Sequence, residues 1–119
     1  PAGARVENHP ALAAHGLAAP LHFDGGDLAA HLAELRARGV RRLFIEGGPT
    51  IASAFIAAGL ADELLVYVAP ALLGGPRLSL GDIGVERMQG IRRLRIEGIE
   101  HLGDDLLIRA SMQQNGQVI

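Results

Sequence analysis

A run of leucines at helical spacing is the clearest periodic signal in the first third of the chain. It consists of Leu28, Leu32 and Leu35. Apolar residues three to four positions apart predict an amphipathic helix, which here runs through about Arg38. Asp24 or Asp27 can cap its start, and Gly39 supplies the left-handed residue that ends it. Residues 1–20 are typical of a loop with one helical turn at Ala11–Ala14, and Leu21–Phe23 is expected to be extended.

Two continuous apolar runs are typical of strands that are buried on both faces. The first is the apolar centre of the segment Val40–Glu46, and the second is Leu64–Ala69. Between them, two glycines lead into Pro49, which suits the first position of a helix, and Gly59 ends that helix. The middle of the chain therefore predicts strand, helix and strand.

The last third of the chain predicts an antiparallel hairpin. Leu94 and Ile96 alternate with arginines, and Leu106–Ala110 forms a return strand after a turn at Gly103-Asp104-Asp105. The full order is helix, strand, helix, strand and hairpin. This order predicts one α/β domain with a mixed sheet, flanked by helices and ending in an antiparallel edge.

Composition then narrows the function classes. The chain has 119 residues, of which 49% are hydrophobic and 20% charged, as in an ordinary globular domain. Its net charge is −2 and its 11 Lys and Arg are spread out, which argues against nucleic-acid binding. No apolar run approaches the roughly 20 residues of a membrane span, so we expect no membrane association and a cytoplasmic protein. With no cysteine and no histidines at ligand spacing, we expect no metal.

The candidate chemistry lies where the first predicted strand passes through Gly47-Gly48 into a helix. Free backbone N–H groups and the positive end of the helix dipole attract phosphate at such a place. Pro49 has no N–H, which leaves Gly48, Thr50 and Ile51 as main-chain donors, while Thr50 and Ser53 add hydroxyls. The pattern is neither a dinucleotide fingerprint nor a P-loop, so an ordinary tight turn explains it equally well from the residues alone.

Several motifs, in this order, resemble the reductase domain of the bacterial bifunctional riboflavin-biosynthesis deaminase-reductases. Phe44–Thr50 resembles the family's [VI]-E-G-G-x-x-[LIV] motif, Ala61–Leu64 its V-D-E-L, and Ala69–Gly75 its A-P-x-[LIV]-[LIV]-G-G. Ile99–Asp105 resembles the closing hairpin. A more distant relative with the same architecture is dihydrofolate reductase.

The resemblance implies a dihydrofolate-reductase-like fold and an NADPH-dependent 5-amino-6-(5-phosphoribosylamino)uracil reductase, which reduces the ribosyl group to the ribitylamino product. It implies a homodimer, a pyrimidine substrate in contact with Glu46, and no catalytic side chain, because the cofactor supplies the hydride. The residues it assigns to the cofactor phosphates are Gly48, Pro49, Thr50, Ile51, Ala52, Ser53 and Ala54. Further candidates for the wall of the site are Gly47, Gly74 and Gly75.

Two patterns of that family are absent: a K-x-A-x-S-x-D-G strand and a V-G-x-x-T-x-x-x-D-x-P-x-L segment. The zinc-deaminase signature is also absent. We therefore expect residues 1–119 to be the C-terminal portion of the reductase domain, inactive by itself. Two alternatives remain: a dihydrofolate-reductase-like oxidoreductase with another substrate, and a non-catalytic dimerisation module. Without the resemblance, a structural role of Glu46 is favoured over substrate contact. That role is either an ion pair with Arg41 or Arg42, or acceptance of hydrogen bonds from N–H groups at the helix terminus.

Overall fold

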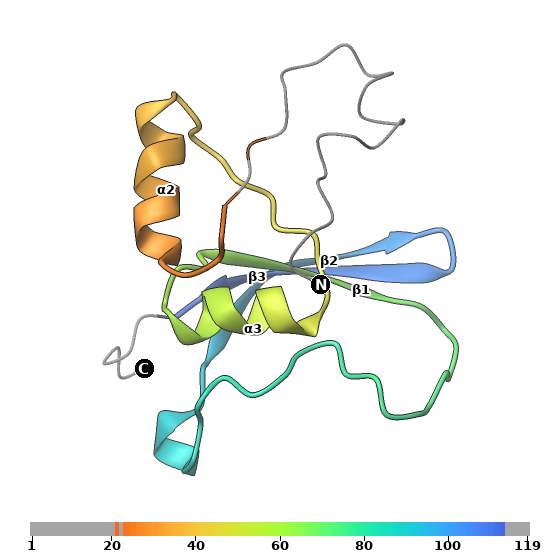
Figure 1. Cartoon of the computed structure of the whole chain (residues 1–119). Coiled ribbons are helices and arrows are strands. Elements are labelled where there is room, and N and C mark those ends of the chain that lie inside the picture. Colours follow the sequence, from red (N-terminus) through yellow and green to blue (C-terminus); the bar gives the residue numbers. More distant parts are fainter. Residues whose placement is uncertain (1–20, 22, 114–119) are drawn as a thin grey trace. The chain divides into compact units, whose positions relative to one another are not determined.

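The computed structural model describes Leu21 and residues 23–113, and the helical turn predicted at Ala11–Ala14 lies outside this part. Two compact units divide the chain, the first ending at Arg41 and the second beginning at Arg42. The elements, in order, are α2 (Leu28–Ala37), α3 (Pro49–Ala57), β1 (Glu63–Val68), the 3₁₀ turn η2 (Met88–Gly90), β2 (Leu94–Leu102) and β3 (Asp105–Met112) (Figure 1). All elements after α2 belong to the second unit.

The helix α2 begins and ends as predicted. The Asp27 side chain accepts a 3.0 Å hydrogen bond from the backbone N–H of Ala30, which satisfies one of the free donors at the helix start. Gly39 has φ +93°, the left-handed conformation that glycine adopts most readily. The prediction of a capped helix followed by a glycine stop is confirmed.

A second acid in the first unit organises the turn before α2. The Asp24 carboxylate accepts a 2.8 Å hydrogen bond from the N–H of Gly26 and lies 2.9 Å from Nε2 of His31. The Gly26 bond lowers the pKa of Asp24 most, and the contact with His31 adds to this effect. The ring of His31 also lies 4.7 Å from that of Phe23, centroid to centroid.

In the second unit, three strands form an antiparallel sheet in the order β1-β3-β2. The predicted hairpin is confirmed: Leu102 pairs with Asp105, and a two-residue turn joins β2 to β3. Gly103 has φ +62° and the next residue, Asp104, has no positive φ, so the turn has the pattern of type II′. A bulge between Ile96 and Gly98 leaves Glu97 as an extra residue in β2.

One face of this sheet is apolar. Directly paired residues share a face, so Val66, Ile108 and Ile99 form one row, and Leu64, Ala110 and Ile96 form the next on the same side. Ala110 is only 1% exposed, whereas Ile96 is 59% and Ile99 60% exposed. The middle of this face, at Ala110 in β3, is therefore covered, whereas the part of the face on β2 is exposed.

The helix α3 supplies much of the buried surface of the second unit. Pro49 is its first residue and Gly59, with φ +70°, follows its end, as predicted. Phe55 and Ile56 are buried. At the C-terminal end of α3, the Arg92 guanidinium donates a 3.4 Å hydrogen bond to the carbonyl oxygen of Ala57. This contact links the helix to the segment before β2.

The prediction of a buried strand at Val40–Glu46 is wrong. These residues form no strand, and Leu43 and Phe44 are 47% and 67% exposed. A strand is defined by hydrogen bonds to a neighbour, and within residues 23–113 no segment pairs with this one. The prediction at Leu64–Ala69 largely coincides with β1, but this strand is not buried on both faces, because each of its residues is exposed or half-buried. It is also an edge strand, bonded only to β3.

Candidate functional site

The two glycines before α3 face different surroundings. A Cβ built on Gly47 would overlap Cγ2 of Ile51, so only glycine fits there without a shift of Ile51 or of the backbone. A Cβ built on Gly48 would meet nothing within 4 Å, and the φ of −74° at Gly48 suits any residue. Packing within the described chain therefore explains glycine at position 47 but not at position 48.

The start of α3 is open to solvent. Gly48 is the N-cap residue, and no side chain of the described residues caps the helix. Pro49 has no N–H, so Thr50 and Ile51 carry first-turn donors without a helical acceptor. Thr50 and Ile51 are both exposed. This end combines free donors with the positive pole of the helix, which suits an anionic ligand.

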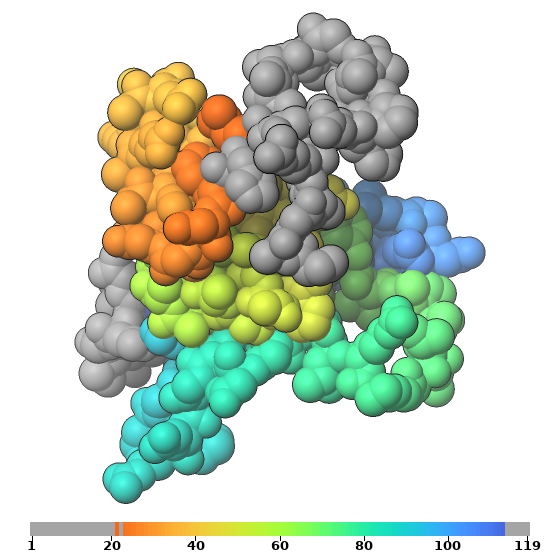
Figure 2. Space-filling view, in the orientation of Figure 1, coloured from red at the N-terminus to blue at the C-terminus, as the bar shows by residue number. Residues whose placement is uncertain are grey.

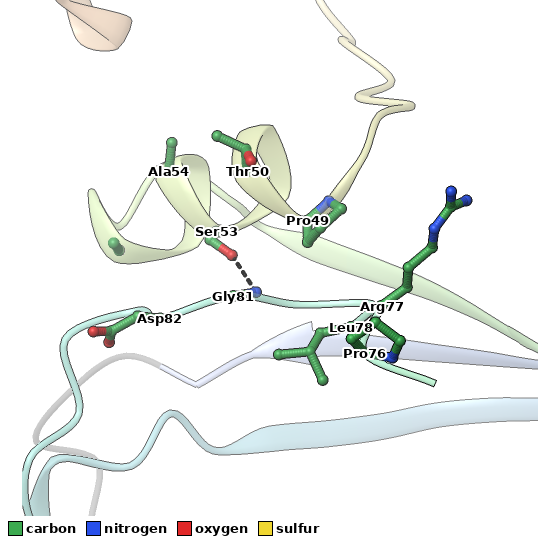
Figure 3. A pocket seen from close by; sticks show the side chains of 10 residues that line it. Pro49, Thr50, Ser53, Ala54, Pro76, Arg77, Leu78, Gly81 and Asp82 are labelled. Carbon is green, nitrogen blue, oxygen red and sulfur yellow. Dashed lines mark hydrogen bonds between the residues drawn. The ribbon is translucent and has the colours of Figure 1, made fainter. Parts of the chain in front are cut away.

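A cleft of about 810 Å³ runs along one side of α3 (Figure 3). One wall is the helix itself and the other is the segment 76–82, which follows the glycine loop after β1. The residues that line it are Pro49, Thr50, Ser53, Ala54, Ala57, Pro76, Arg77, Leu78, Gly81 and Asp82. Four of the seven residues assigned to the cofactor are thus on the surface of one cleft.

One hydrogen bond joins the two walls. The backbone N–H of Gly81 donates to Oγ of Ser53 at 2.7 Å, across 28 residues of sequence. Ser53 is 6% exposed, the one buried polar residue in the part of the chain described. Figure 3 shows the bond between the helix and the extended segment, and in Figure 2 the surfaces of the two lie against each other.

The second wall brings charged residues that the sequence did not indicate. Arg77 and Asp82 line the cleft from the segment 76–82. The Asp82 carboxylate accepts a 2.7 Å hydrogen bond from the N–H of Gly84, which has φ +81° and turns the chain away. No periodic or spaced pattern places this segment beside α3. Only a pattern that relates residues about 28 positions apart could have predicted that this segment lies beside α3.

The remaining predicted residues lie outside the cleft lining. Gly48 and Glu46 are exposed just before α3, and Ile51 and Ala52 lie on the helix but do not line the cleft. The wall candidates Gly47, Gly74 and Gly75 do not line it either.

Glu46 makes none of the ion pairs found among the described residues, so the alternative pairing with Arg41 or Arg42 is not formed. The described chain also holds no group of three side chains that could bind a metal, and no helix of it is long and apolar enough to cross a membrane.

Comparison with known proteins gives one consistent family. The model of the RibD C-terminal domain matches residues 5–108. The riboflavin biosynthesis protein RibD of Escherichia coli is 34% identical over 90 residues, which are 75% of this chain and 24% of that protein. The 2,5-diamino-6-ribosylamino-4(3H)-pyrimidinone 5′-phosphate reductase of Archaeoglobus fulgidus is 36% identical over 87 residues, 71% of this chain and 37% of that protein.

The solved structure of Acinetobacter baumannii RibD agrees with this. One form superimposes with a TM-score of 0.69 and 31% identity, over 79% of this chain and 26% of that one. The chain spans about a quarter of the length of this RibD protein and of the E. coli one. The fold, an α/β domain with an antiparallel sheet, agrees with the match to the family model, and so does the Gly-Gly start of α3. The chain belongs to the RibD C-terminal domain family.

Proposed function

We propose that this chain supplies one wall of the cofactor and substrate site of an NADPH-dependent pyrimidine reductase of riboflavin biosynthesis. The reaction is the reduction of the ribosyl group of 5-amino-6-(5-phosphoribosylamino)uracil to the ribitylamino product. Membership of the RibD C-terminal domain family supports it, as does the similarity to a protein named as a pyrimidinone phosphate reductase. Because the chain spans a small part of its relatives, the rest of the site belongs to other residues of the complete reductase.

The observation that carries the cofactor assignment is the open backbone at Gly48. Neither packing nor conformation requires glycine there, and the uncapped start of α3 follows immediately. A side chain at this position would instead occupy the space through which a phosphate reaches the N–H groups of Thr50 and Ile51. We therefore assign the phosphates of NADPH to the stretch Gly48–Ala54, with the N–H groups of Thr50 and Ile51 as the donors.

Substrate contact is proposed for Glu46. Its carboxylate is exposed and makes no ion pair in the part of the chain described. A carboxylate accepts hydrogen bonds only, which suits the N–H groups of an aminopyrimidine. Glu46 stands two residues before the N-cap of α3, so the substrate and the cofactor would meet at one end of the helix.

Bound NADPH would supply the hydride that reaches the ring-opened ribose carbon. The residues of this chain would contribute binding and alignment: main-chain donors at the start of α3 and the Glu46 carboxylate. Holding two reactants in an aligned pose can lower a barrier by roughly 7–11 kcal/mol. No side chain described here is placed to transfer a proton to a defined atom, so none is assigned a catalytic role.

The proposal includes a homodimer acting in the cytoplasm, where a biosynthetic reductase would draw on NADPH. Exposed Ile96 and Ile99 on the apolar sheet face support an association surface. Sedimentation of the complete reductase would test the dimer.

The deciding experiment combines a titration with an assay on the complete reductase. NADPH binding is followed by fluorescence, and NADPH consumption is measured with 5-amino-6-(5-phosphoribosylamino)uracil, with NADH as the comparison. Saturable NADPH binding and formation of the ribitylamino product support the proposal. Binding without turnover of this pyrimidine would favour a related oxidoreductase with another substrate, and absence of binding would favour a non-catalytic module.

A further inference from the structure

We infer that Ser53 is a positioning residue of the cofactor cleft, which acts by holding the segment 76–82 against α3. This inference rests on the proposed function, because it takes the cleft to be part of the NADPH site. Its basis is the hydrogen bond that Gly81 N–H donates to Ser53 Oγ at 2.7 Å (Figure 3). Within the part of the chain described, no other side-chain hydrogen bond joins the two walls of this cleft.

The burial of Ser53 favours a positioning role over direct contact with a phosphate. The side chain is 6% exposed, whereas Thr50, one turn earlier on the same helix, is exposed. One acceptor site of the Ser53 oxygen is already used by the N–H of half-buried Gly81, and loss of this acceptor would cost free energy. The Ser53 hydroxyl is therefore engaged with the second wall of the cleft, which favours a positioning role over contact with a phosphate.

The fit at Gly81 shows how closely that wall is held. A Cβ built on Gly81 would lie 3.2 Å from Ser53 Oγ and 3.9 Å from the carbonyl oxygen of Pro49. At 3.2 Å the neighbour would have to give way by a few tenths of an ångström. Since Arg77 and Leu78 reach the cleft from the same segment, the width of the cleft depends on this contact.

The first test needs no cofactor. Hydrogen exchange of the segment 76–82 is measured by mass spectrometry in the complete reductase, for the wild type and for Ser53→Ala. Without the acceptor, we expect exchange in this segment to become roughly 3- to 10-fold faster. Ser53→Thr keeps a hydroxyl and should restore slow exchange. Unchanged exchange in a folded Ser53→Ala variant would overturn the inference.

The second test measures NADPH affinity. For Ser53→Ala we expect the Kd for NADPH to rise roughly 3- to 10-fold, with the KM for the pyrimidine little changed. Ser111→Ala is the matched control, because its hydroxyl makes a hydrogen bond of the same length, 2.7 Å, to Glu97 in the sheet. An equal loss of affinity in both variants would mean that Ser53 acts only through general stability.

The third test addresses the pair directly and serves if Ser53→Ala does not fold. Gly81→Ala places a methyl group against Ser53 and should raise the Kd for NADPH by itself. In the double variant the Ser53 oxygen is gone, so the added methyl should do less harm than it does alone. Additive effects would overturn the inference. If wild-type enzyme does not bind NADPH, the proposed function fails, whereas normal binding by Gly81→Ala removes only the role of Ser53.

Discussion

Gly47 and Ile51 are in such close contact that a Cβ at position 47 would overlap the Cγ2 atom of Ile51. Ile51 is β-branched and lies in the first turn of α3, where its χ1 angle has little freedom. The neighbouring Gly48 has open space on its side-chain side. Substitution of these two adjacent glycines should therefore affect different properties: stability for Gly47 and NADPH affinity for Gly48.

For Gly47→Ala, we expect a loss of about 1–3 kcal/mol in the free energy of unfolding, because either the Ile51 side chain or the start of α3 must shift. Denaturant titration of the complete reductase measures this loss. The NADPH affinity of the folded fraction should change less than it does for substitutions at Gly48. Wild-type stability of Gly47→Ala would show that the turn yields without cost.

For Gly48→Val, we expect the Kd for NADPH to rise about tenfold or more, because the side chain excludes the phosphates from the backbone. Gly48→Ser separates this effect from helix stability. Serine is a good N-cap residue, so α3 should be as stable as in the wild type or more so, while NADPH affinity still falls. Fluorescence titration and thermal unfolding measure the two quantities. Unchanged NADPH affinity in both variants would contradict the phosphate assignment.

For Glu46→Gln, we expect kcat/KM for the pyrimidine to fall, with little change in NADPH affinity. Losing a hydrogen bond to a charged group typically costs about 1.5–3 kcal/mol, which is roughly 10- to 150-fold. Steady-state kinetics with each substrate varied in turn separates the two ligands. An effect confined to thermal stability would return Glu46 to a structural role.

For Asp24, we expect a pKa below the usual value of an aspartate, as followed by carbon-13 NMR of its carboxyl group. The Gly26 N–H bond is the main cause, so His31→Ala should raise this pKa only part of the way back. A carboxylate with a lowered folded-state pKa stabilises the fold above its unfolded-state pKa, and this contribution is lost as the pH falls through the folded-state value. A full return in His31→Ala would make the imidazole the main cause.

Local signals were sufficient for the ends of the helices and for the hairpin. Asp27, Gly39, Pro49 and Gly59 act within one turn of the chain, and Gly103 sets its turn by its own φ angle. The prediction of a strand at Val40–Glu46 was wrong because a strand forms only beside a partner segment. The apolar composition of a segment does not show whether such a partner exists. The contact of Ser53 with Gly81 was missed for a related reason, since it joins residues 28 positions apart with no repeated pattern.

The exposed apolar residues bear on the behaviour of these 119 residues expressed by themselves. Leu43 and Phe44 precede α3 in an unpaired segment, and Ile96 and Ile99 lie on the incompletely covered sheet face. Unpaired apolar segments and open sheet faces promote association between chains. We expect self-association of this protein in sedimentation experiments. Replacing Phe44 by Ser should reduce it.

We further expect the 119-residue protein to show no pyrimidine reductase activity. Hydride transfer requires the two reacting carbons to be held about 3–3.5 Å apart in an aligned pose. The cleft along α3 is open, and the ligand contacts that we propose come only from Glu46 and the start of this helix. Ligands can touch such a wall without being fixed by it, so weak NADPH binding should persist while turnover is absent. An NADPH-oxidation assay beside the sedimentation profile checks this, and turnover by a monodisperse monomer would show that the site is self-contained.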